Sequence, residues 1–303
     1  MKALTPESHV FSFRSSHEAA MRMDPGQDLE IETLDCFSNQ IVSEEQTIGD
    51  IDLGRVNPTT GPVYVDGARP GDLLRVSIED IRTRDWGIVC TLPEIGVLQH
   101  TLDGRARTRR LPIKDGQVTF KDFEFPSLPM IGVIGVAPAE GEVVNGQPGD
   151  HGGNMDNHLI TAGSRVYFPV QVPGALFALG DLHASMGDGE ICGTGVETAG
   201  TVRLRLDVGE RPAALDLPLV ETDDAWWVVA SADELDEAIE KASRSMQRLL
   251  MQAWGLDEVD AFLYQSIQGD LHICQYCKPS PFRVVVRFGI RKVNGRPPIV
   301  PVR

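Results

Sequence analysis

The chain has 303 residues and carries 44 acidic against 28 basic side chains, which gives a formal net charge of −16. Nucleic-acid binding needs a basic surface that neutralises phosphates, so this acidic balance opposes a nucleic-acid partner. No apolar run approaches the roughly 18 residues of a membrane-spanning helix, and the first residues lack the apolar core of a secretory signal, so we expect a cytoplasmic protein that binds no membrane.

Three similar segments that open with Pro-Gly organise the chain. They are DPGQDLEIETLD (24–35), RPGDLLRVSIED (69–80) and, more loosely, VPGALFALGDLH (172–183). Pro-Gly suits the central positions of a type II turn, and the alternation that follows is typical of a half-buried strand. Each copy ends at an acidic residue, Asp35, Asp80 or Asp181. For the Asp80 copy, a common hairpin without a functional role is an equally good interpretation.

Seven further segments have the composition of short strands: 87–91, 117–120, 132–137, 165–170, 202–208, 226–230 and 282–289. With 30 glycines and 20 prolines to form the turns between them, they predict a mainly β fold. We expect a β-rich barrel or sandwich built on the Pro-Gly hairpin repeats. Because no stretch has the composition of a linker, residues 1–303 are predicted to form a single intertwined domain.

A few peripheral helices are predicted, all late in the chain. Ser231 followed by Glu234 forms a capping-box pattern, and apolar residues recur behind it at helical spacing up to Gly255. A second, short helix is predicted from about Asp257 to Gln268. Their apolar stripes indicate packing elements and not functional ones.

The run over residues 151–197 holds the densest collection of potential metal ligands, with glycines beside nearly all of them. Asp181 and His183 are two residues apart, so on a strand they would share one face. We take this pair as the core of a site. Asp188 and Glu190 follow on a turn that glycines allow to bend sharply. For Asp188 alone, an exposed hairpin turn is the favoured interpretation.

Other candidates lie at turns and strand ends. Asn154 and Asp156 belong to the loop GGNMDN, Glu197 follows the glycine-rich GTGV, and Asn39 follows Asp35 at the end of the first repeat strand. Asparagine amides can donate hydrogen bonds to a developing oxyanion, although simple turn formation would also explain them. Two lone histidines carry little weight: His151 and His158.

Some familiar patterns are absent or incomplete. Cys274 and Cys277 have CxxC spacing, but no second pair completes a structural zinc site, and the segment resembles a strand and not a helix start. Their role stays unassigned. Five cysteines do not make a disulfide framework, in keeping with a reducing compartment. No Walker, dinucleotide or serine-hydrolase motif occurs.

Taken in order, the motifs TLDCFSNQI, NPTTGPVYVDGARPGDLL, GVIGVAPAEGEV, HGGNMDN and GDLHASMGDGEICGTGVE resemble the acetamidase/formamidase family, from about residue 8 to residue 290. The resemblance implies a β-rich, metal-dependent hydrolase that converts short aliphatic amides, such as formamide and acetamide, to ammonia and the carboxylate. It carries over nine positions within matching motifs: Asp35, Asn39, Asn154, Asp156, Asp181, His183, Asp188, Glu190 and Glu197.

Three hypotheses follow. In the first, a divalent ion, zinc or alternatively calcium, activates a water molecule for attack on a small amide substrate. The candidate ligands are Asp181, His183, Asp156, Glu197, Asp35 and Asp188. Glu190 would be the general base, and Asn39 or Asn154 would hold the oxyanion.

In the second hypothesis the nucleophile of the amidase is a cysteine, Cys36 or Cys192, although these motifs hold no lysine to activate it. In the third, the chain is a non-catalytic β protein that binds a metal ion structurally. A homo-oligomer, a dimer or larger, is expected from its prevalence among soluble proteins.

Overall fold

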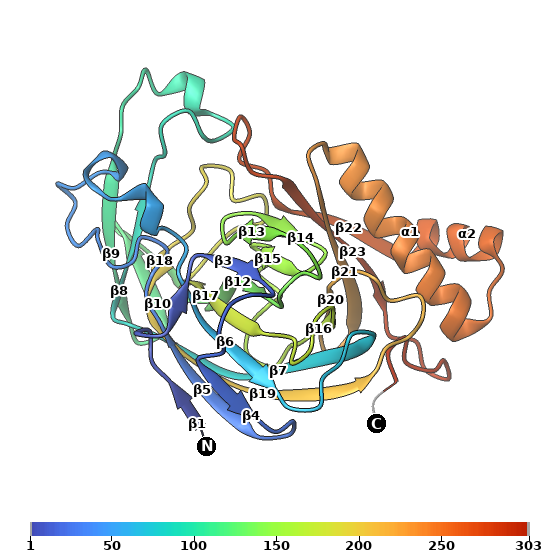
Figure 1. The fold of residues 1–303 in the computed structure, drawn as a ribbon. Helices are drawn as coiled ribbons and strands as arrows, with labels where there is room; N and C mark the ends of the chain where they lie inside the picture. The colour runs from blue at the N-terminus through green and yellow to red at the C-terminus, as the bar shows by residue number, and fades with distance from the viewer. Residues whose placement is uncertain (1, 302–303) are drawn as a thin grey trace.

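The computed structural model describes residues 2–301, and its fold is mainly β with two helices late in the chain, as predicted (Figure 1). One sheet of this region has nine strands. Their order across the sheet is β1 (Lys2–Leu4), β5 (Asp28–Thr33), β19 (Gly200–Glu210), β7 (Asp72–Thr83), β16 (Arg165–Pro169), β20 (Leu219–Glu221), β21 (Ala225–Ala232), β23 (Val284–Arg291) and β22 (Gly269–Gln275).

A twelve-stranded sheet forms the second layer. Its main path is β11 (Phe123–Pro126), β10 (Gln117–Phe120), β9 (Thr108–Lys114), β8 (Trp86–Cys90), β18 (Glu197–Thr198), β17 (Phe177–His183), β12 (Met130–Gly135), β15 (Gly152–Asn154) and β14 (Pro148–Gly149). Strand β6 (Thr59–Val65) pairs with β17 and adds β2 (His9–Val10) and β4 (Met21–Met23). A separate pair joins β3 (Ser12–Arg14) to β13 (Glu142–Val144).

The Pro-Gly segments form turns that lead into strands. Gly26, Gly71 and Gly174 have φ angles of +81°, +98° and +75°, as the third residue of a type II turn requires. The first two repeat strands, β5 and β7, lie on either side of β19 in the nine-stranded sheet. The third, β17, lies in the twelve-stranded sheet, where it pairs with β12, β6 and β18.

The largest apolar core contains buried side chains from both sheets. Leu29 and Ile31 of β5 belong to the same cluster as Leu179 and Leu182 of β17. The alternation that predicted a half-buried strand over the first repeat is confirmed, because Leu29, Ile31 and Thr33 are all buried. Strand β17 is buried along its whole length. Polar side chains on β17 are therefore enclosed by protein, and they need partners there.

The two helices, α1 (Leu235–Trp254) and α2 (Glu258–Gln268), lie together at one end of the molecule (Figure 1). Helix α1 packs its apolar face, including Met246 and Leu249, against β21 and β23. Its end at Gly255, which has a φ angle of +68°, is as predicted. In the part of the chain that the structure describes, neither helix is long and apolar enough to cross a membrane.

The predicted start of the first helix is wrong. Ser231 was expected to cap it, but Ser231 and Ala232 belong to β21 and pair there with Val285 and Val284 of β23. The helix begins only at Leu235, after Glu234. The backbone of Ser231 and Ala232 forms strand hydrogen bonds with β23, some 50 residues away, and is therefore not available to start the helix. Tertiary pairing here outweighs local helix propensity.

The hairpin of β22 and β23 extends the nine-stranded sheet toward the loop that joins β17 to β18. The backbone N–H of Gly189 in that loop donates to the carbonyl of Cys274 at 3.0 Å, and the N–H of Tyr276 donates to the carbonyl of Gly189 at 2.7 Å. The loop after β17 and the end of β22, nearly 90 residues apart in the sequence, are thus held side by side.

Candidate metal and catalytic centre

Adjacent strands position the core of the site. Asp181 and His183 lie on β17, and Glu197 lies on β18 directly opposite His183 in the antiparallel register. Directly opposed residues of such a pair project from the same face. The Nε2 atom of His183 lies 3.0 Å from Oε2 of Glu197 and 3.4 Å from Oδ1 of Asp181. The structure therefore brings this predicted pair together with the predicted glutamate.

Asp156 approaches the same imidazole from the loop after β15, with its Oδ1 atom 3.9 Å from Nε2 of His183. Gly132, in the middle of β12, allows this approach. A Cβ atom at Gly132 would lie only 2.6 Å from Oδ1 of Asp156 and 2.6 Å from Oδ2 of Asp181. A glycine inside a strand often marks such a close approach, and here it makes room for two carboxylates.

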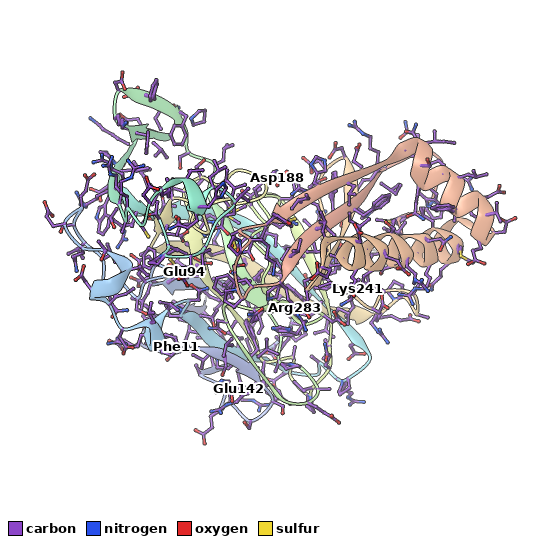
Figure 2. The ribbon with its side chains drawn as sticks, turned by 90° about the horizontal axis from the view of Figure 1, so that it is seen from above. Phe11, Glu94, Glu142, Asp188, Lys241 and Arg283 are labelled. Carbon is purple, nitrogen blue, oxygen red and sulfur yellow. The ribbon has the colours of Figure 1, made fainter. Side chains whose placement is uncertain are left out.

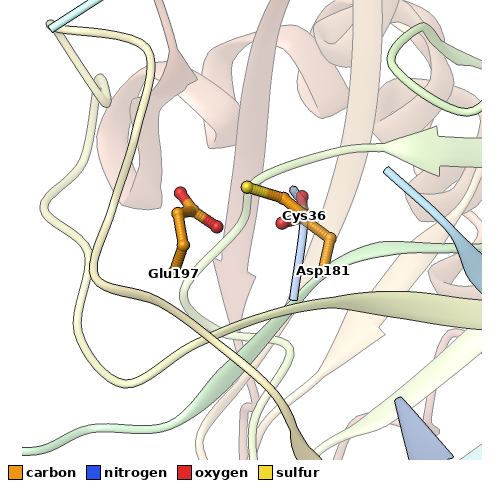
Figure 3. Close-up of side chains that lie close together, drawn as sticks. All are labelled: Cys36, Asp181 and Glu197. Atoms are coloured by element: carbon orange, nitrogen blue, oxygen red, sulfur yellow. The ribbon is translucent and has the colours of Figure 1, made fainter. Parts of the chain in front are cut away.

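Glu190 completes the group from the loop between β17 and β18. Glu190, Asp156 and His183 each offer a ligand atom within 4.8 Å of the others. A second such group consists of Asp181, Glu197 and the thiol of Cys36 (Figure 3). We call five of these buried residues the acidic centre: Asp156, Asp181, His183, Glu190 and Glu197.

Three members of the acidic centre have a left-handed backbone. Asp156, Asp181 and Glu190 have φ angles of +40°, +57° and +40°. Each such residue costs on the order of 1 kcal/mol or more, and this kind of strain concentrates at ligand-binding and active sites. The acids are therefore held in their places against local backbone preference, which supports a functional role for the cluster.

The electrostatics of the acidic centre favour a cation. Burial, reinforced by Glu190 and Asp181, raises the pKa of Asp156 well above its ordinary value. Burial also raises the pKa of Glu190, and it raises that of Glu197 to about 8. For His183, burial alone would lower the pKa, but the carboxylates of Glu197 and Asp181 outweigh it and raise the pKa well above 6.5. A positive charge in the middle of the group would relieve this repulsion.

Unpaired atoms in the acidic centre fit a divalent ion. Oδ1 of Asp156, Oδ1 of Asp181 and Oε2 of Glu197 are buried and form no hydrogen bond within the described residues. Buried carboxylate oxygens are costly unless they are paired or coordinate a metal. Carboxylate oxygens with one imidazole nitrogen are ligands of Zn²⁺, and a set of carboxylate oxygens also suits Ca²⁺.

Asp35 and Asn39, two other predicted site residues, have different partners. Asp35 is fully buried, and its Oδ2 accepts a hydrogen bond from Nη2 of Arg84 at 2.5 Å. Its Oδ1 accepts from the backbone N–H groups of Phe37 and Asn39. Asn39 is exposed, and its Oδ1 accepts from Nη1 of Arg84 at 3.0 Å. Because both oxygens of Asp35 are engaged in folding the turn around Cys36, and the side chain of Asn39 is exposed and held by Arg84, we place neither residue among the ligands or oxyanion donors.

Asp188 also lies outside the group of converging oxygens. Its carboxylate forms a bidentate pair with the nearly fully buried Arg287, with both N–O distances 2.6 Å. Nδ1 of His158 lies 2.9 Å from Oδ1 of Asp188. Partial burial opposes ionisation of Asp188, but hydrogen bonds from His158 and Arg287 outweigh it and hold its pKa well below the ordinary value. Figure 2 shows Asp188 beside the β22–β23 hairpin, where this pair fastens the loop that carries Glu190.

Two further candidates, Asn154 and His151, are buried. Asn154 is buried on β15, two residues before Asp156, and its Oδ1 has no hydrogen-bond partner among the described residues. His151 is buried edge-on against Phe13, with ring centroids 5.1 Å apart, and burial lowers its pKa to about 4. A neutral histidine packed against an aromatic ring in this way is consistent with the low weight given to His151 as a site residue from the sequence.

Sequence reasoning missed Gln275 and Arg287 on the C-terminal hairpin and Gly132 on β12. The Nε2 group of Gln275 donates to the carboxylates of Asp156 and Glu190. Gly132 had a usable signal, because it interrupts the buried strand MIGVIG. For Gln275 and Arg287 there was none, since their contacts depend on the pairing of distant segments.

Comparison with known proteins identifies the family of the chain. A sequence profile of the acetamidase/formamidase family matches residues 12–145 and 141–217. The formamidase of Methylophilus methylotrophus is 28% identical over 250 residues, covering 60% of this chain and 59% of that protein. The acetamidase of Mycolicibacterium smegmatis is 28% identical over 258 residues, covering 63% of each. The chain thus spans about three fifths of the length of the curated relatives it matches.

Two solved structures match nearly the whole chain. An acetamidase from Bacillus halodurans superposes with a TM-score of 0.91 at 40% identity, covering 95% of this chain and 97% of that one. A predicted acetamidase/formamidase from Thermoanaerobacter tengcongensis superposes with a TM-score of 0.92 at 43% identity, covering 96% and 95%. The two-sheet architecture described above is therefore shared with these proteins.

Proposed function

Because the chain belongs to the acetamidase/formamidase family, we propose that it hydrolyses short aliphatic amides of the formamide and acetamide type to ammonia and the carboxylate. The names of the formamidase and acetamidase relatives support this substrate class. We propose further that a divalent metal ion takes part. The convergence of unpaired oxygens of Asp156, Asp181 and Glu197 on Nε2 of His183 carries this second part.

The residues that would hold the ion are Asp156, Asp181, His183 and Glu197. When bound, a divalent ion supplies Lewis-acid polarisation of the amide carbonyl and a lowered pKa of water. The imidazole favours Zn²⁺, and the number of carboxylates makes Ca²⁺ the alternative. Gly132 leaves the space in which Asp156 and Asp181 approach each other.

We assign the proton transfers to Glu190. Its carboxylate is buried and receives a hydrogen bond from Gln275 at 3.0 Å. A general base works best when its pKa lies near the operating pH, and burial shifts the pKa of Glu190 in that direction. Glu190 would take a proton from the attacking water and return it to the leaving nitrogen. Asn154, buried two residues before Asp156, would donate from its Nδ2 group to the developing oxyanion.

A cysteine nucleophile has less support. Cys36 lies within the site, but burial, and then the neighbouring Glu197 and Asp181 carboxylates, raise the pKa of its thiol well above the usual range. Since the thiolate is the reactive form, this environment keeps Cys36 protonated and unreactive. We therefore assign the attack to water and give Cys36 no catalytic role.

A panel of short amides tests the proposed function. Purified protein would be incubated with formamide, acetamide and propionamide, and ammonia release would be measured beside elemental analysis of the same sample. We expect ammonia from at least one amide together with about one equivalent of bound metal. Bound metal without ammonia from any of the three would contradict the amidase assignment and favour a non-catalytic metal-binding protein.

A further inference from the structure

Gln275, the last residue of β22, is a buried glutamine with one half of its amide group unused. It is 2% exposed and lies beyond residues 12–217, the part of the chain that the family profile matches. Its Nε2 group donates to Glu190 Oε2 at 3.0 Å and to the carboxylate of Asp156. Its Oε1 atom is buried and has no hydrogen-bond partner within the described residues.

The chemistry of the two neighbouring carboxylates fixes which way this amide faces. Only the NH₂ end of Gln275 has two N–H donors, one for each of the Asp156 and Glu190 carboxylates, so this end faces them. Its carbonyl end then remains as a lone acceptor beside the acidic centre. The same end of β22 is anchored by the backbone hydrogen bonds of Cys274 and Tyr276 to Gly189, so the side chain is held in place from both directions.

A primary amide carries the group that this acceptor lacks. Its NH₂ group offers two N–H donors, and the lone acceptor of Gln275 lies beside the acidic centre that we propose to hold the catalytic ion. From this geometry we propose that Oε1 of Gln275 accepts a hydrogen bond from an N–H of the substrate amide and so selects amides that carry an N–H over N,N-disubstituted amides. The inference rests on the proposed amidase function of the same site and adds a specificity-determining residue to it.

The discriminating variant is Gln275→Met, which keeps the length of the side chain and removes both the donor and the acceptor. Formamide turnover is the assay, and N,N-dimethylformamide, which has no N–H, is added as a competing ligand, so that its inhibition constant is obtained whether or not it is hydrolysed. A matched control is Gln265→Met. Gln265 is also a buried glutamine with an unpaired Oε1, but it lies on α2, where its Nε2 donates to the carbonyl of Ala261.

Loss of one neutral hydrogen bond to the substrate predicts a fall in kcat/KM for formamide of roughly three- to tenfold in Gln275→Met. The inhibition constant of N,N-dimethylformamide should change less than twofold, because this amide has no N–H to donate to Gln275. Bound metal, measured by elemental analysis, should stay at the wild-type level. Gln265→Met should leave both kinetic constants unchanged.

Three results would overturn the inference. An equal weakening of formamide and N,N-dimethylformamide binding would show that Gln275 only supports the shape of the site, and an unchanged kcat/KM would show that it contacts no substrate. A loss of bound metal in Gln275→Met would show that it acts through Asp156. Failure of the proposed function looks different, because the wild-type protein itself would then release no ammonia from formamide.

Discussion

Nε2 of His183 lies 3.0 Å from Oε2 of Glu197, which faces it across the β17–β18 pair and forms no hydrogen bond through this oxygen within the described residues. The other carboxylate oxygen, Oε1, accepts the backbone N–H of Gly195 at 2.8 Å. One oxygen of Glu197 is thus fixed by the backbone, while the other faces the imidazole at ion-pair distance. This arrangement is expected of a ligand that is oriented before the metal arrives.

Replacing Glu197 by glutamine should remove the metal. The Glu197→Gln side chain keeps its shape but loses the charge that binds the ion. Substitution of residues that only support a metal ligand lowers metal affinity roughly 10- to 100-fold, and we expect a larger fall for the ligand itself. Competition with a chelator of known affinity would measure this fall. Glu142→Gln, at an exposed ion pair with Arg14, is the control and should bind metal normally. Wild-type affinity in Glu197→Gln would remove Glu197 from the ligand set.

Gly132→Ala tests the close approach of two carboxylates. The added Cβ atom would meet Asp156 and Asp181 at 2.6 Å, so these side chains must separate. We expect loss of metal and activity, with destabilisation of about 1–3 kcal/mol from overpacking. Gly209→Ala, where nothing lies within 4 Å of the added atom, is the matched control. If Gly132→Ala retained full metal binding and turnover, the proposed packing of the two acids would be refuted.

Asp188→Asn should separate anchoring from metal binding. The change weakens the pair with the buried Arg287 and leaves that cation poorly compensated, so we expect a loss of about 1–3 kcal/mol in the free energy of unfolding, less than for a fully buried pair because Asp188 is partly exposed. Urea unfolding measures this change, and elemental analysis should find bound metal unchanged. If Asp188→Asn lost its bound metal as completely as Glu197→Gln, Asp188 would have to be counted among the metal ligands.

The metal-free protein should become less stable as the pH rises from 6.5 to 8. Burial raises the pKa of Glu197 from 4.5 to about 8, so in this window the folded protein holds a proton that the unfolded chain has released. Raising the pH therefore favours unfolding, and the raised pKa of His183 acts in the same direction. Thermal unfolding in excess chelator measures the effect. A midpoint that rises over this range would contradict the charge distribution described for the acidic centre.

The strands and the central ligand pair could be predicted because their signals are local. Pro-Gly turns and two-residue alternation identified β5, β7 and β17, and the spacing of Asp181 and His183 indicated one shared face. Glu197 could be suggested but not placed, since its position opposite His183 depends on the register of β18. The sequence alone left Asp188 as one of several acids in a glycine-rich turn, and only its contact with Arg287 separates it from the ligands.

The C-terminal contribution could not be predicted. Gln275 lies between two cysteines whose CxxC spacing was left without an assigned role, and its contact with Glu190 depends on a bridge between Gly189 and β22. The first helix shows the same limit, because pairing of β21 with β23 displaced its predicted cap at Ser231. In both places the structure depends on contacts between segments that are distant in the sequence, and local sequence patterns do not predict such contacts.

Ammonia release before and after metal removal tests the central claim most directly. The protein would be assayed with formamide and acetamide as purified, after dialysis against a chelator, and after return of Zn²⁺ or Ca²⁺ to the dialysed sample. We predict that turnover disappears with the metal and returns when one equivalent of the correct ion is restored. Full turnover in protein shown by elemental analysis to be metal-free would contradict the account.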